Sequence, residues 1–118
     1  MHYQNALVWR KAMEVARGVY GLVPLLPREE VYGMRSQLTR AAVSVATNIA
    51  EGWTRESPRD KLHFLTIAHG SLSEVETMMT LCEDFGWFPS ARTAGVRAAI
   101  DETSRMLTAL RRRKRNER

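Results

Sequence analysis

The sequence has few of the residues that covalent or metal chemistry requires. Cys82 is the only cysteine in 118 residues, so no intrachain disulfide can form and a reducing compartment is favoured. The histidines form neither a Glu-x-x-His pair nor an H-E-x-x-H motif, and no paired-cysteine motif or phosphate-binding glycine loop is present. We therefore predict no cofactor, no metal site, no catalytic residue and a protein that is not an enzyme.

Long hydrophobic runs are also absent. No apolar stretch approaches the roughly 20 residues that span a bilayer. The N-terminal segment MHYQNALVWRKAMEV carries charges at Arg10, Lys11 and Glu14 and has no continuous apolar core of the kind that signal peptides contain. These features predict a cytoplasmic protein with no membrane partner.

Glycine and proline are scarce, and they divide the chain into four segments with helical spacing of apolar residues. We predict helices over about 6–23, 30–51, 58–85 and 91–112. Two-residue alternation is not sustained anywhere, so a sheet has no support. Four helices of similar length joined by short turns predict an all-α fold, an antiparallel up-down-up-down four-helix bundle over residues 1–110.

The expected helix ends follow from local chemistry. Asn5 is a predicted N-cap for the first helix, and Gly52 is a predicted C-cap glycine for the second. Ser57 is a predicted N-cap for the third, because Pro58 suits the first helical position. The third helix is expected to end at Gly86.

Positive charge is concentrated at the C-terminal end. Residues 111–118, RRRKRNER, hold six of the 18 Lys and Arg and one of the 13 acids, whereas residues 1–110 are neutral overall. Such a basic tail binds RNA, DNA or an acidic partner in many proteins, but it also fits a solvated helix end. The predicted nucleic-acid contacts are Arg111, Arg112, Arg113, Lys114 and Arg115.

The segment RAAVSVATNIAEG, residues 40–52, places a polar stripe beside small apolar residues on one predicted helix. Antiparallel pairing of the second and third helices brings Arg40 near Glu74, and a partly buried pair of this kind would fix helix register. Asn48 and Glu51 are expected to bond free amides of the following turn. The stripe is interpreted as a polar lock between helices or across a subunit seam, with a ligand or nucleic-acid role as the alternative.

The segments LPREEVYGM (26–34), QLTRAAVSVATNIAEGWTR (37–55) and FLTIAHGSLSEVET (64–77) resemble the family of small proteins encoded in intervening sequences of the bacterial 23S ribosomal RNA gene. The resemblance implies a four-helix bundle that assembles as a ring-like homopentamer, with no established catalytic activity. The positions that match the family motif are Arg40, Ser44, Asn48, Glu51, Gly52, Gly70, Ser71 and Glu74.

A related branch consists of accessory proteins of diversity-generating retroelements, which form basic pentamers that bind nucleic acid and a reverse transcriptase. The neutral body of this chain departs from that branch. Two functions are therefore expected: a homo-oligomer that binds RNA or DNA non-specifically through its basic C-terminal ends, or a scaffold that recruits a reverse transcriptase or another protein partner. Trp53 beside Arg55 suits stacking on unpaired bases, and it equally suits capping of a bundle end.

Overall fold

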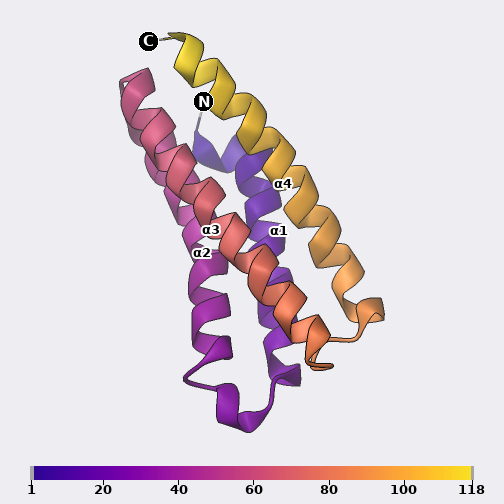
Figure 1. The fold of residues 1–118 in the computed structure, drawn as a ribbon. Coiled ribbons are helices and arrows are strands. Elements are labelled where there is room, and N and C mark those ends of the chain that lie inside the picture. Colours follow the sequence, from indigo (N-terminus) through magenta and orange to yellow (C-terminus); the bar gives the residue numbers. More distant parts are fainter. Residues whose placement is uncertain (1, 118) are drawn as a thin grey trace.

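A computed structural model describes residues 2–117, and within that range the chain is all-helical with no strands. Four α-helices, α1 (Leu7–Leu22), α2 (Met34–Thr54), α3 (Pro58–Asp84) and α4 (Ser90–Glu117), run alternately up and down. Short 3-10 turns precede α1 (Tyr3–Asn5) and connect α1 to α2 (Val23–Leu25 and Arg28–Glu30). Each helix packs against the next, and α4 returns to α1 (Figure 1). The predicted four-helix architecture is confirmed.

The core is built from one apolar stripe on each helix. On α2 the stripe is Leu38, Ala42, Val45 and Ile49, none of which has exposed surface. Its alanines lack bulk, which lets α3 approach closely along most of its length. Burying such stripes is the main source of stability for helices of this kind. None of the helices within residues 2–117 combines the length and hydropathy that crossing a bilayer requires.

Both ends of α3 use the predicted signals. The Ser57 hydroxyl accepts a hydrogen bond from the Asp60 N–H at 3.1 Å, and Pro58 occupies the first helical position. At the other end Gly86 has φ +79°, a left-handed conformation that favours glycine. The Trp87 N–H then bonds the carbonyl of Cys82 at 2.9 Å, which completes a Schellman motif.

Two predicted caps are wrong. Asn5 is the last residue of a 3-10 turn, and Ala6 takes the N-cap position of α1 without a side-chain hydrogen bond. Gly52 lies inside α2 and is buried, because the helix continues to Thr54. A Cβ at Gly52 would lie 3.2 Å from the Cβ of Phe64. This glycine therefore serves the close approach of α2 and α3.

The bounds of two helices differ from the prediction. The start of α2 is delayed to Met34, whose N–H is capped by the Glu30 carboxylate at 3.0 Å. At the other end of the chain α4 extends to Glu117, so residues 111–117 of the expected tail are helical, and Arg118 lies outside the described residues. Arg and Lys are good helix formers and suit the negative end of the helix dipole, which explains the extension.

Candidate nucleic-acid interface

The polar stripe of α2 is partly an internal contact with α3. The hydroxyls of Ser44 and Ser71 lie 2.8 Å apart across the interface, and Ser71 is buried. The side-chain amide of Asn48 donates to the Ser44 hydroxyl and carbonyl, both at 2.9 Å. Because each buried polar group needs a partner, these three residues specify how α2 and α3 pair.

The expected ion pair between Arg40 and Glu74 does not form. Among the ion pairs of residues 2–117, none joins the Arg40 guanidinium to the Glu74 carboxylate within 4.0 Å. Both residues are exposed. In water an ion pair gains little over separate hydration of its partners, so nothing holds the two side chains together. The register is set by the Ser44–Ser71 contact instead.

Glu51 holds the α2–α3 turn by a route that differs from the prediction. Its carboxylate pairs with the guanidinium of Arg55 at 3.2 Å rather than with backbone amides of the turn. The same guanidinium lies over the ring of Phe64, 4.7 Å from its centroid. Asn48 is one turn too early to reach the loop and bonds back to Ser44. The turn is therefore tied by side chains of α2 and α3.

Arg111, the first residue of the basic run 111–115 on α4, contacts a side chain of α3. Its Nη1 lies 2.8 Å from Nδ1 of His69, and Nε2 of His69 lies 3.0 Å from the Ser104 hydroxyl. Arginine only donates, so Nδ1 must accept and Nε2 must carry the hydrogen that is donated to Ser104. Burial and the Arg111 charge lower the pKa of His69, in keeping with a neutral ring. In this tautomer His69 cannot take a proton from Ser104, so the pair does not form an activated nucleophile.

The other residues of the basic run, 112–115, lie toward solvent or along the flank of α4. Lys114 is half-buried and pairs with Glu117 at 3.2 Å. Arg112, Arg113 and Arg115 are exposed, and within residues 2–117 no acid lies within ion-pair distance of any of them. These three guanidinium groups are the ones whose charge is available to a phosphate.

The surroundings of these residues are also basic. The C-terminal half of α4 lies beside the start of α1 and the α2–α3 turn (Figure 1). Segments 2–10, 51–63 and 110–117 together hold nine Arg and Lys against four Asp and Glu. At the opposite end, segments 20–36 and 80–97 hold four of each. The basic end therefore carries a net positive charge, whereas the opposite end is neutral.

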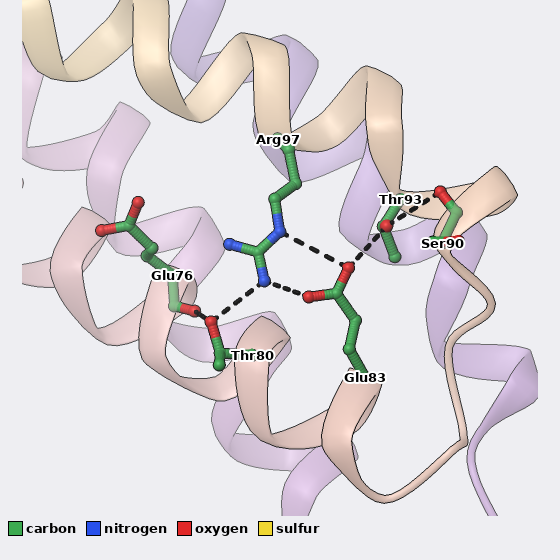
Figure 2. A network of polar contacts seen from close by, with 6 residues as sticks. All are labelled: Glu76, Thr80, Glu83, Ser90, Thr93 and Arg97. Atoms are coloured by element: carbon green, nitrogen blue, oxygen red, sulfur yellow. Dashed lines mark hydrogen bonds and ion pairs between the residues drawn. The ribbon is translucent and has the colours of Figure 1, made fainter.

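The neutral end contains a polar network between α3 and α4 (Figure 2). Arg97 on α4 forms an ion pair with Glu83 on α3, and its Nη2 donates to the Thr80 hydroxyl at 3.0 Å. The Thr93 hydroxyl donates to the other Glu83 oxygen at 2.7 Å. These hydrogen bonds from Arg97 and Thr93 lower the pKa of Glu83, so the carboxylate stays charged. The Glu83 carboxylate is therefore paired within the chain.

Cys82 is fully buried in the core. Burial, reinforced by the charges of Glu30 and Glu83, raises the pKa of its thiol to about 11. The thiol is therefore protonated at neutral pH and a poor nucleophile. Among residues 2–117 no group of three or more His, Cys, Asp and Glu side chains has the geometry of a metal site.

Sequence reasoning missed the His69–Ser104–Arg111 cluster and the Glu83–Arg97 pair. Both depend on the register between α3 and α4, which no single helical pattern contains. A signal was nevertheless present, because Ser104 and Arg111 are seven residues apart and share one face of α4. An antiparallel pairing of α3 with α4 would have placed that face beside His69.

Residues 4–109 match the family of 23S rRNA-intervening sequence proteins, and the chain belongs to that family. No protein with a curated description matches.

The structure is similar to a crystal structure of a protein of unknown function from the S23 ribosomal protein family of Bacteroides thetaiotaomicron VPI-5482. The TM-score is 0.81 at 23% sequence identity, and the match covers 89% of this chain and 98% of the other. At this identity the likeness shows the shared fold alone.

Proposed function

We propose that the protein is a homo-oligomer, with the ring of five that the family resemblance implies, and that it binds RNA or DNA non-specifically through the basic end of each bundle. The observation that supports this most directly is the trio of exposed guanidinium groups on the last turns of α4: Arg112, Arg113 and Arg115. They are held on a helix, so their spacing is fixed in advance of binding. Phosphate contacts of this kind supply most of the affinity of sequence-independent binding.

Oligomerisation would multiply the effect of each basic end. Several copies that present weak sites to one strand bind it far more tightly than a single copy does. Large apolar side chains remain exposed on the single chain, among them Tyr32 at 94%, Phe85 at 57% and Tyr20 at 54%. Such surface is typical of association between chains. Light scattering would show a mass near five times 13.5 kDa if the ring forms, and a monomer would contradict this part of the proposal.

The binding itself is tested by removing two charges that have no acidic partner within residues 2–117. Arg112→Gln with Arg115→Gln is expected to weaken binding to a single-stranded RNA and to reduce its salt dependence. The slope of log K against log salt should fall by about 1.4 for each chain that touches the strand, at about 0.7 per phosphate contact. Fluorescence anisotropy of a labelled RNA over a range of salt concentrations measures both quantities.

The matched control removes the same charge from the neutral end. Arg28→Gln with Arg92→Gln alters two exposed guanidinium groups that have no ion-pair partner within residues 2–117. This variant should bind within about twofold of the wild type, because only net charge at long range has changed. Equal losses for the two variants would mean that binding follows total charge and that the basic end is no site. Absence of RNA binding by the wild type would favour the scaffold function.

A further inference from the structure

An open hollow lies at the basic end, between the start of α1, the end of α2 and the last turns of α4. Its volume is about 470 Å³, within the usual range of small-molecule sites. Its lining includes Asn5, Leu7, Trp53, Met106, Leu110 and Arg113. Leu7 remains 58% exposed, so an apolar side chain at the hollow is left uncovered.

A second, smaller hollow of about 180 Å³ adjoins the first. Trp53, Leu110 and Arg113 line both, so the indole and the guanidinium stand at the junction. Lys61 lines the second hollow, and its ammonium donates to the carbonyl of Trp53 at 3.1 Å. The two hollows together form a trough with apolar and aromatic walls and cations along its margin.

The trough selects for a particular chemistry. Its apolar wall favours a flat or hydrophobic group, and Arg113, which has no acidic partner within residues 2–117, favours an adjacent negative charge. An unpaired nucleotide combines both, because its base has an apolar face and is flanked by phosphates. A base inside a duplex is stacked on its neighbours and is not available to the trough.

We propose that the trough binds one unpaired nucleobase against Trp53, with Arg113 on a flanking phosphate, so that the protein prefers single strands to duplexes. This inference rests on the proposed function and adds to it a class of ligand. The Asn5 side chain at the rim can bond the edge of the base. Arg112 and Arg115 continue the basic surface along α4 beyond the trough.

The test compares two strands of equal length and charge, twelve thymidine nucleotides and twelve abasic nucleotides. The thymidine strand should bind about 5- to 150-fold more tightly, the range that stacking of a base on an aromatic side chain contributes. In a variant with Trp9→Phe and Trp87→Phe, thymidine should quench the fluorescence of the remaining Trp53, and the abasic strand should not.

Two variants locate the effect. Trp53→Leu removes the indole, and Ala109→Phe fills the larger hollow from a rim position that is exposed in the free chain. Each should lower thymidine affinity to the abasic level and leave abasic affinity unchanged. Ala94→Phe is the matched control, because Ala94 is exposed on α4 and lines neither hollow. Circular dichroism verifies that each variant is folded. If Trp53→Leu does not fold, Ala109→Phe alone still tests the site.

The outcomes separate the two levels of the proposal. Equal affinity for the thymidine and abasic strands, with strong salt dependence for both, would overturn the nucleobase site and leave phosphate binding intact. Absence of binding to either strand would overturn both. Binding of an acidic, leucine-containing peptide in place of both strands, lost in Ala109→Phe, would assign the trough to a protein partner.

Discussion

The two ends of the bundle are built from similar residues but use them differently. At the α3–α4 turn, the charges of Glu83 and Arg97 satisfy each other, and Phe88 is buried beneath the turn with 2% of its surface exposed. At the other end, beside the α2–α3 turn, Arg112, Arg113 and Arg115 have no acidic partner within residues 2–117, and a hollow stays open next to Trp53. Groups that are satisfied within the chain stabilise the fold, whereas unsatisfied groups are available to a ligand. Under the proposed function, a ligand binds at the basic end, whereas Glu83, Arg97 and Phe88 stabilise the fold at the other end.

The largest expected effect comes from removing the buried ring of Phe88 at the α3–α4 turn. Phe88→Ala should lower the free energy of unfolding by about 3–5 kcal/mol, because it removes a buried aromatic side chain and leaves a cavity. Phe85→Ala is the matched control three residues earlier, where the ring is 57% exposed. That change should stay within about 0.5 kcal/mol. Urea unfolding followed by circular dichroism measures both, and similar losses would mean that Phe88 does not close this end.

The same contrast explains which parts of the structure could be predicted from the sequence. Local sequence was sufficient to predict both ends of α3. A serine followed by proline begins the helix, and a glycine in a left-handed conformation ends it, each through contacts within a few residues. It failed at Gly52, because a glycine that ends a helix and one that admits a neighbouring helix look alike in sequence. Pattern alone does not reveal which neighbour a residue meets.

Only part of the candidate interface could be predicted from the sequence, because the rest depends on how the helices pair. A basic run is visible in the sequence, and it predicts contacts at Arg111, Arg112, Arg113, Lys114 and Arg115. The inward turn of Arg111 depends on how α3 and α4 pair, and so does the hollow beside Trp53. The run was expected to leave the helix after residue 112, yet its continuation to Glu117 gives the basic side chains their fixed spacing.

A smaller effect on stability is expected from the ion pair of Glu83 and Arg97 near the α3–α4 turn. A double-mutant cycle with Glu83→Gln and Arg97→Met should give a coupling free energy of about 1 kcal/mol. The contribution is present above the usual carboxyl pKa of 4.5 and is lost as pH falls through the lowered pKa of folded Glu83, because the protonated acid no longer pairs. Denaturant unfolding of the four proteins at pH 7 and in acid measures the coupling and its pH dependence.

The control for this cycle is a pair on the surface of α4. Asp101 and Arg105 lie 2.9 Å apart, one helical turn from each other, with both side chains well exposed. Their coupling should be only about 0.3–0.5 kcal/mol. If the two cycles gave equal values, the hydrogen bonds of Thr80 and Thr93 would add nothing to the network, and the α3–α4 turn would owe its stability to packing alone.

The smallest effect is expected where the basic end joins the bundle. The pKa of His69 is lowered in the folded chain, so below its ordinary value of 6.5 the unfolded chain binds the proton more tightly. Stability should therefore be complete above pH 6.5 and decline as pH falls toward the folded pKa, by less than about 1 kcal/mol, the net contribution of a single hydrogen bond. The reason is that a protonated ring cannot accept a hydrogen bond from Arg111 and repels its charge.

His69→Asn keeps a hydrogen-bond acceptor but cannot titrate. The denaturant midpoint of unfolding of this variant should therefore change less between pH 6.5 and 5 than that of the wild type. Equal slopes for the wild type and His69→Asn would show that the docking of α4 does not depend on the protonation of His69.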